Sequence, residues 1–375
     1  MSLAGKMGAC AAGSGPEIGE ATDGYISLCD KLVHAFSTYA GSPCIGARPS
    51  KDAAIEWASY AEVGQQAHRL GVAMRAEGAP SGSIVAICRQ RDQWWYTYDV
   101  AAQMMSLVSV GLDSSASQDS LVGLCRNIAP WWIVVDHTSV NQVIGAIRQL
   151  QSSDVVNLPR MVYADDDVRP GSESAGCMIT TSQLLDSVTK MESSDFPGPQ
   201  GRGPHELATL VCTSGSSGVP KAVELTDSVW SRRVYQPRRA SPPNAFPDHE
   251  KDKVWVSFQP PFHTMDRKSV WETILVGGRV GIHNDSHGKD TLWRDFRDLR
   301  PERVLASPAF WNQLHADFQM NGSTPEARAL ILARLGGNIG VGNISGAKPS
   351  PGLVKFMTEI LGFSKPPGNN YSSSE

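Results

Sequence analysis

Residues 213–221, the most informative segment of the chain, read Thr213-Ser214-Gly215-Ser216-Ser217-Gly218-Val219-Pro220-Lys221. An apolar run, residues 207–211, leads into it and a strand-like run, residues 223–226, leads out of it, which predicts a tight loop between two strands. The glycines let the backbone approach a phosphate closely, the hydroxyl and N–H groups can donate to phosphate oxygens, and Lys221 adds a positive charge. These features together are typical of a loop that binds polyphosphate.

Two other interpretations of this stretch can be weighed from its spacing. A Walker loop needs Gly-Lys-Ser/Thr leading into a helix, and it is excluded because Val219 and Pro220 separate Gly218 from Lys221. A flexible Ser/Gly-rich linker would account for a Gly-Ser run alone. The strand before the loop and the Pro-Lys after it favour phosphate binding over a linker.

Upstream of this loop, from about residue 59, helical and strand patterns alternate, which predicts βαβ units and a largely parallel sheet. Ser59 and Glu62 have the spacing of a capping box, and the helix that they begin should end near Gly78. We expect strands at residues 84–88, 107–110, 133–135 and 161–163, and helices at residues 94–105, 140–150 and 183–190. Residues 192–206 and 236–253, rich in Pro, Gly or charge, are predicted surface loops.

Composition limits the class of protein. The 375 residues carry a net charge of −4, with 41% apolar and 19% charged residues, which is typical of a folded soluble protein, and the length favours two packed subdomains. The charge provides no field for nucleic acid, and no apolar run reaches the roughly 20 residues of a membrane span. Seven cysteines without zinc-ligand spacing and an N-terminus without a signal-peptide pattern predict a cytoplasmic protein with reduced thiols.

Residues 213–222 resemble the signature Thr-Ser-Gly-Ser/Thr-Thr-Gly-x-Pro-Lys-Gly of the adenylate-forming (AMP-binding) superfamily, with Ser217 for Thr and Ala222 for the last Gly. Further stretches are similar to the family in the family's order. Residues 254–263 end in Pro-x-x-His at His263, residues 300–311 resemble a stretch that lines the acyl pocket, and residues 345–350 contain the turn with Gly346 and Ala347. The chain closes on Tyr371-Ser372-Ser373-Ser374-Glu375, similar to Tyr-Gly-x-Thr-Glu. In all, the resemblance extends over about residues 55–375.

The resemblance implies an α/β fold, the N-terminal lobe of an adenylate-forming enzyme, built from two stacked αβαβα-type subdomains. Residues 55–195 would form the first subdomain and residues 205–375 the second, which carries the ATP-binding motifs. Residues 1–54 would be an N-terminal extension and the start of the lobe. The family's small C-terminal lobe is absent from a chain that ends at Glu375, so we expect this chain alone to be incomplete for the whole reaction.

The resemblance also implies a function and a site. A carboxylic acid, fatty or aromatic, would be activated with ATP and Mg²⁺ to an acyl-adenylate, on the way to a thioester with coenzyme A or a carrier-protein phosphopantetheine. The expected catalytic residues are Lys221, His263, Ser374 and Glu375, with His263 orienting the acid and Glu375 holding Mg²⁺. The expected nucleotide contacts are Thr213, Ser214, Gly215, Ser216, Ser217, Gly218, Lys221, Gly346, Ala347, Tyr371 and Ser374.

Within the family, Met265-Asp266-Arg267 and Gly277-Gly278 are most similar to the adenylation domains of carboxylic acid reductases, followed by long-chain acyl-CoA synthetases. A catalytically dead nucleotide-binding or interaction protein is the alternative, because Cys212 and Ser372 depart from the family pattern. Nucleic-acid binding through the arginines near residues 232–239 is disfavoured, since arginines beside a loop are usually a solvated face.

Overall fold

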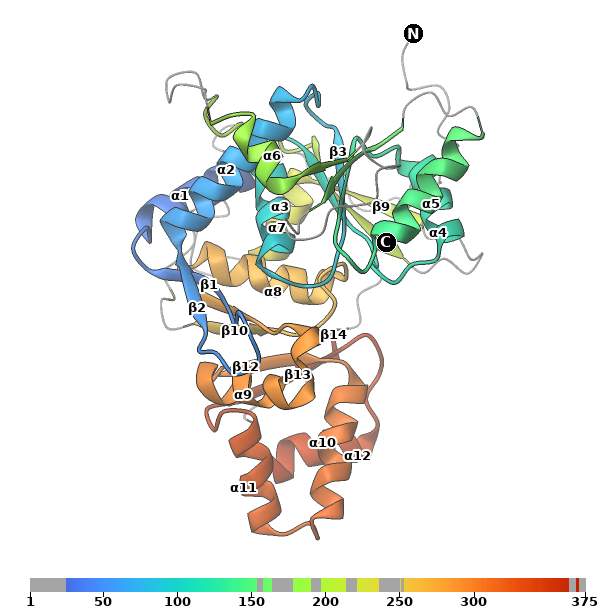
Figure 1. Ribbon diagram of the computed structural model, residues 1–375. Helices are drawn as coiled ribbons and strands as arrows, with labels where there is room; N and C mark the ends of the chain where they lie inside the picture. Colours follow the sequence, from blue (N-terminus) through green and yellow to red (C-terminus); the bar gives the residue numbers. More distant parts are fainter. Residues whose placement is uncertain are drawn as a thin grey trace.

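The computed structural model describes residues 25–153, 158–163, 178–189, 197–213, 221–235, 250, 253–363 and 369–370 (Figure 1). These residues form three β-sheets with helices packed around and between them, and the predicted α/β class is confirmed. Among the described residues, no helix is both long enough and apolar enough to cross a membrane.

The largest sheet has seven strands in the order β7-β6-β5-β3-β4-β8-β9. Six strands run parallel, and the edge strand β9 is antiparallel to β8. The strands are β3 (Ile84–Cys88), β4 (Val108–Gly111), β5 (Trp132–Val135), β6 (Arg160–Tyr163), β7 (Met178–Thr180), β8 (Leu207–Thr213) and β9 (Lys221–Thr226). The central strands β3, β4 and β5 are almost wholly buried, as expected for a parallel sheet covered by helices on both faces.

Alternate residues of these strands pack into two separate cores. Ala86 and Cys88 of β3 face the helices α4 (Gln118–Ile128) and α5 (Val140–Gln151). Val85 and Ile87 face the larger core, which also contains residues of α1 (Leu28–Thr38), α2 (Tyr60–Ala76), α3 (Gln93–Met104), α6 (Thr181–Asp186), α7 (Asp227–Val234) and α8 (Thr264–Leu275). The period-2 alternation of a strand thus produces a helical layer on each face of the sheet.

A second sheet of four strands has the order β10-β11-β1-β2. Its strands are β1 (Pro43–Ala47), β2 (Glu56–Ser59), β10 (Val254–Ser257) and β11 (Arg279–Ile282), with β2 antiparallel to β1 and the others parallel. Figure 1 shows α8 between this sheet and the large sheet. Val270, Trp271 and Ile274 of α8 are buried there, in the same core as Val280 of β11.

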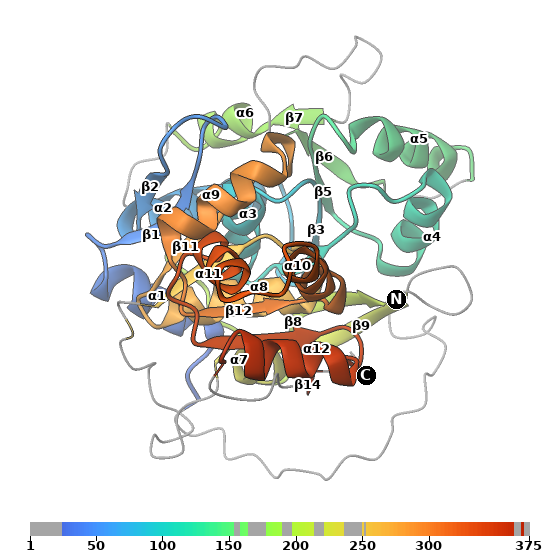
Figure 2. The same cartoon turned by 90° about the horizontal axis from the view of Figure 1, so that it is seen from below.

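The third sheet is parallel and contains β12 (Arg303–Ala306), β13 (Val341–Ser345) and β14 (Asn369–Asn370). Its own core includes Trp311, Phe296 and Phe356. The surrounding elements are η3 (Asp285–His287), α9 (Lys289–Leu299), α10 (Pro308–Met320), α11 (Pro325–Arg334), α12 (Pro351–Lys355) and the π-helical turn η4 (Phe356–Ile360). This end of the molecule lies opposite β3 and α6 in Figure 1, and Figure 2 views it directly.

Most predicted elements are confirmed, but two predictions are wrong in detail. The helix expected at residues 183–190 spans residues 181–186, because Thr180 and Gln183 form a capping box that begins it earlier. The predicted surface loop before β8 contains a buried arginine, Arg202, which donates to Gln103 Oε1 at 2.5 Å and Leu107 O at 2.7 Å. A polar residue in a loop sequence can therefore be part of the core when distant partners satisfy it.

The sheets also bear on the predicted subdomains. The large sheet combines β3 to β7 with β8 and β9, which come from the other side of residues 195–205. The four-stranded sheet combines residues 43–59 with residues 254–282. Strand pairing therefore crosses the boundary expected at residues 195–205, and the division into residues 55–195 and 205–375 stays a prediction.

Candidate functional site

The predicted phosphate-binding loop begins and ends at the base of a β-hairpin. Thr213 ends β8 and Lys221 begins β9, and the two residues pair in antiparallel register. The Thr213 hydroxyl donates to the Lys221 carbonyl at 3.4 Å, and the Lys221 side chain is exposed. The strands predicted on either side of the loop are confirmed. The loop residues Ser214, Gly215, Ser216, Ser217 and Gly218 lie outside the described residues.

This hairpin base lies at the carboxyl edge of the large sheet. In open parallel sheets, ligands bind outside the carboxyl ends of the strands. β4 and β8 are parallel neighbours with Val110 beside Leu210. Asp113, just beyond the end of β4, and Thr213, the last residue of β8, therefore lie at the same edge. Asp113 is exposed, and its carboxylate accepts the N–H of Ser115 at 2.9 Å and the Ser115 hydroxyl at 2.7 Å. Sequence reasoning missed Asp113, although an aspartate directly after a buried strand was a signal for this edge.

His263 lies against the same edge. It is the N-cap residue of α8 and follows the loop from β10. The preceding residue, Phe262, approaches β4 so closely that a Cβ atom at Gly111 would lie 2.6 Å from Phe262 Cα. Protein atoms around the exposed His263 lower the pKa of its imidazole by desolvation, while the charge of Asp113 acts in the opposite direction. The ring is therefore neutral at pH 7 and can exchange hydrogen bonds with a ligand.

Gly346 and Ala347 lie in an exposed turn after β13, in the third sheet. Gly346 has φ +90°, a conformation that glycine adopts without strain. The neighbouring strand β14 pairs Asn370 with Ser345, so it ends one residue before Tyr371. Tyr371, Ser374 and Glu375 lie outside the described residues.

The structure thus brings Thr213 and Lys221 together, places His263 at the same sheet edge, and puts Gly346 and Ala347 on a separate sheet. The expected Mg²⁺ ligand, Glu375, is not among the described residues. Within the described part of the chain, no group of three or more His, Cys, Asp or Glu side chains is placed to hold a metal ion.

Asp266 and Arg267 of the run Met265-Asp266-Arg267 are buried in the core, whereas Met265 is half-buried. The buried carboxylate of Asp266 accepts from the Tyr96 hydroxyl at 2.6 Å, the Ser257 hydroxyl at 2.6 Å and Trp255 Nε1 at 3.2 Å. Burial raises the pKa of this carboxyl, and the charge of Arg91 together with these hydrogen bonds opposes the rise. The network fixes the first turn of α8 directly behind His263.

Arg267, the next residue of α8, forms a buried ion pair with Asp99 of α3. Its Nε donates to Asp99 Oδ2 at 2.8 Å and one terminal nitrogen donates to Oδ1 at 2.6 Å. The same nitrogen donates to Ser109 Oγ of β4 at 2.7 Å, and the guanidinium lies 4.9 Å from the centroid of the Trp230 ring. Two-bond pairing of this kind fixes orientation as well as distance. α8 is therefore tied to both α3 and β4.

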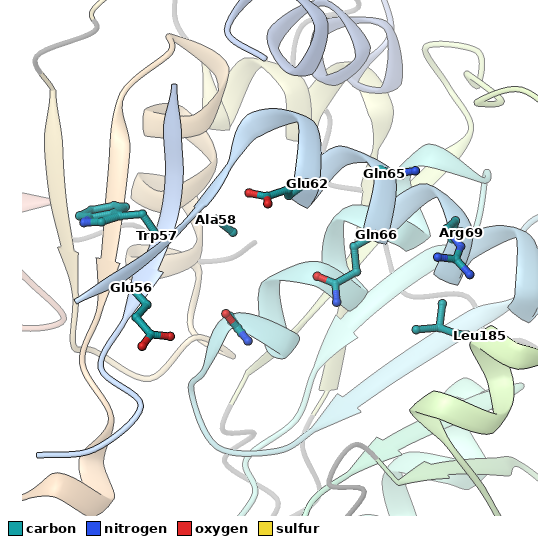
Figure 3. A pocket seen from close by; sticks show the side chains of 9 residues that line it. Glu56, Trp57, Ala58, Glu62, Gln65, Gln66, Arg69 and Leu185 are labelled. Atoms are coloured by element: carbon teal, nitrogen blue, oxygen red, sulfur yellow. The ribbon is translucent and has the colours of Figure 1, made fainter. Parts of the chain in front are cut away.

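A separate open cavity of about 480 Å³ lies between α2, β2 and the start of α3 (Figure 3). Polar side chains line it, among them Glu56, Gln66 and Arg69, with Leu185 of α6 beside them. Glu62 also lines it, but its carboxylate already accepts the Ser59 N–H at 2.7 Å in the capping box of α2. None of the candidate site residues lines this cavity.

Comparison with known proteins identifies the family. The model of the AMP-binding enzyme family matches residues 41–375, and the chain belongs to this family. A curated relative, long chain acyl-CoA synthetase 7 (peroxisomal) of Arabidopsis thaliana, is 26% identical over 304 residues, which are 80% of this chain and 40% of that protein. Long-chain-fatty-acid–CoA ligase 6 of Homo sapiens is 22% identical, over 85% of this chain and 45% of the relative. The chain thus spans about two fifths of the length of these relatives.

Solved structures show the same fold. The A domain of carboxylic acid reductase from Segniliparus rugosus, in complex with AMP and a co-purified carboxylic acid, matches with a TM-score of 0.72 and 20% identity, over 93% of this chain and 60% of that chain. The N-terminal subdomain of NpsA from Klebsiella oxytoca, in complex with 3-hydroxybenzoyl-AMSN, matches with a TM-score of 0.65 and 16% identity, over 93% of this chain and 73% of that chain. The predicted N-terminal adenylation lobe is confirmed as the fold of this chain.

Proposed function

We propose that this chain binds ATP and a carboxylic acid at the carboxyl edge of the large sheet and joins them into an acyl-adenylate. The observation that carries the proposal is the β8–β9 hairpin base, where Thr213 and Lys221 pair at the edge against which His263 also lies. A family model that matches residues 41–375 supports the same reaction.

In the proposed reaction a carboxylate oxygen attacks the α-phosphorus of ATP, and the bond from this phosphorus to the oxygen that bridges to the β-phosphate breaks. Pyrophosphate leaves with the electron pair of that bond, so the site must neutralise charge on the departing phosphates. Lys221 and the hydroxyls of the loop would contact those phosphates. The neutral His263 ring would hold the acid, and Ser374 would contact the α-phosphate. Mg²⁺, when bound by Glu375 and phosphate oxygens, would screen the negative charge of the nucleotide.

The later half-reaction and the substrates are also part of the proposal. We expect a thioester with coenzyme A or a phosphopantetheine thiol, because the curated relatives are named acyl-CoA synthetases and CoA ligases. Their names also support a fatty acid, whereas the 3-hydroxybenzoyl-AMSN complex of NpsA supports an aromatic acid. We propose the cytoplasm as the compartment.

The test is acid-dependent release of pyrophosphate from ATP and Mg²⁺, with a panel of fatty and aromatic acids. Lys221→Ala should lower the rate by about 10²–10³-fold, because it removes a charge that acts on the leaving group. Lys289→Ala, at an exposed lysine that begins α9, is the matched control and should retain the wild-type rate. Equal rates in the two variants would contradict the role of the hairpin.

The alternative is a nucleotide-binding protein without catalytic activity. Cys212, one of the two departures that suggested this alternative, now has a structural explanation. It packs against the core that α4 and α5 cover, and burial raises the pKa of its thiol to about 11. The Cys212 side chain thus serves packing at this position. ATP binding without pyrophosphate release in the presence of any acid of the panel would favour this alternative.

A further inference from the structure

Arg91 is a buried arginine at the carboxyl edge of the large sheet, in the connection between β3 and α3. Only 4% of its surface is exposed to solvent. Sequence reasoning gave it no role, because nothing in its neighbourhood along the chain indicates what it contacts. Its three partners lie 168 to 194 residues further on, in the loops that follow β10 and β11.

The guanidinium of Arg91 joins the carboxyl edges of two sheets. Nε donates to the His283 carbonyl at 2.9 Å, one terminal nitrogen donates to the Gln259 carbonyl at 2.8 Å, and the other donates to Asp285 Oδ1 at 2.6 Å. Arg91 itself follows β3 of the large sheet, whereas Gln259 and His283 follow β10 and β11 of the four-stranded sheet. A planar group with fixed donor directions sets the relative positions of its acceptors, which a flexible ammonium would not.

The Gln259 carbonyl, which accepts from Arg91, belongs to the first residue of the loop that ends at His263. This loop, residues 259–263, is held near both of its ends. Arg91 binds its first residue, and the backbone of Phe262 lies against Gly111 of β4. Just beyond the loop, Asp266 fixes the first turn of α8, and the charge of Arg91 also acts on this buried carboxylate.

We propose that Arg91 is a positioning residue for His263. By binding the Gln259 backbone it sets where residues 259–263 stand relative to the edge of β4 and β8, and therefore where a bound carboxylate meets the phosphate-binding hairpin. This inference rests on the proposed function, in which His263 orients the acid. It assigns to Arg91 no contact with substrate, and its effect reaches the reaction through the loop.

The test compares Arg91→Met, which keeps an unbranched apolar stem and removes the guanidinium donors, with Arg48→Met. Arg48 is an equally buried arginine that follows β1, donates to Asp295 at 2.6 Å and also binds Asp298 and the Ala53 carbonyl. None of these bonds goes to residues 259–263, and Arg48 reaches Arg91 only through Asp295 and His283, so it is a matched control for the loss of a buried arginine that does not bind the loop directly. The first readout is the NMR signals of the His263 ring without ligand, assigned through His263→Gln. The second is the KM for acid and for ATP in pyrophosphate release, with thermal unfolding as the check of folding.

Arg91→Met should shift the His263 signals and raise the KM for acid by about tenfold or more, while the KM for ATP changes by less than about threefold. Arg48→Met should lower the melting temperature comparably and leave the His263 signals in place. Unchanged His263 signals in a folded Arg91→Met protein would overturn the inference. So would a parallel rise of both KM values, because a merely structural role predicts that pattern.

Two further outcomes are decided by the same readouts. If the wild-type protein releases no pyrophosphate, the proposed function fails, and the His263 signals alone decide the role of Arg91. If Arg91→Met does not fold, Arg91→Lys replaces it, since an ammonium keeps the charge but cannot reproduce the three directed bonds. A shift of the His263 signals in Arg91→Lys supports the inference, and its absence overturns it.

Discussion

At the scale of the residue, the site depends on a close approach that only glycine permits. A Cβ atom at Gly111 would lie 2.6 Å from Phe262 Cα and 2.9 Å from Trp95 Cζ2. We predict that Gly111→Ala lowers the free energy of unfolding by about 1–3 kcal/mol, because the chain must move to relieve overpacking. Urea denaturation measures this, with Gly41→Ala as the control, since no atom lies within 4 Å of a Cβ there. Equal stability of the two variants would show that the approach is not tight.

Some residues of the site could be predicted from the sequence, and others could not. Thr213 and Lys221 were predicted because the pattern that carries them is local, a strand followed by a loop and a second strand. The role of Arg91 could not be predicted, because its acceptors lie more than 160 residues away. Two of them are backbone carbonyls, which every residue has and which no residue type indicates. Long-range contacts of side chains with the backbone require the fold before they can be recognised.

At the scale of the element, the connection from β5 to α5 is held by one buried carboxylate. Asp136 accepts the Gln90 N–H at 2.7 Å and the Ser139 N–H at 3.1 Å, and it binds both the hydroxyl and the N–H of Thr138. Burial alone would raise the pKa of this carboxyl, but these hydrogen bonds and the charge of Arg89 lower it overall. Asp136 thus holds the turn that precedes α5, and its backbone carbonyl accepts the Val140 N–H at 3.0 Å, whereas the N-cap residue Ser139 makes no capping bond with its side chain.

This arrangement predicts how the stability of the element depends on pH. Because the folded pKa of Asp136 is below the unfolded value of about 3.9, its contribution is present above that pH and is lost as pH falls through the folded value. We expect Asp136→Asn to lower the free energy of unfolding by about 1–3 kcal/mol at pH 7, and by less near pH 3. Urea denaturation of both proteins at pH 7, 5 and 3 measures the difference. A difference that is the same at all three pH values would contradict the pKa direction.

The elements themselves were largely predictable, and the exceptions have a physical reason. The strand at residues 84–88 and the capping box at Ser59 follow from local pattern and are found as predicted. The position of β1 beside β11 was not predictable, because this pairing joins residues more than 200 positions apart, such as Ile45 and Val280. Periodicity specifies which face of a strand is buried, but it does not identify the partner strand.

In the molecule as a whole, two sheets bring the proposed phosphate-binding and acid-binding groups to one edge. The large sheet contributes the hairpin base, and the loop after β10 of the four-stranded sheet brings His263 to it. The buried Arg267–Asp99 pair and the bonds of Arg91 tie these sheets and the helix between them into a fixed arrangement. In the proposed reaction, Lys221 would neutralise charge on the phosphates and the neutral His263 ring would offer a hydrogen bond to the approaching anion.

Nucleotide binding by the β8–β9 hairpin can be measured by calorimetric titration of the chain with ATP and Mg²⁺, beside Lys221→Ala and the control Lys289→Ala. We expect saturable binding to the wild-type protein and to Lys289→Ala, and a dissociation constant at least about tenfold higher for Lys221→Ala, which corresponds to about 1.4 kcal/mol. Absence of binding at any practical concentration, or equal affinity of all three proteins, would contradict the claim that the β8–β9 hairpin holds the nucleotide.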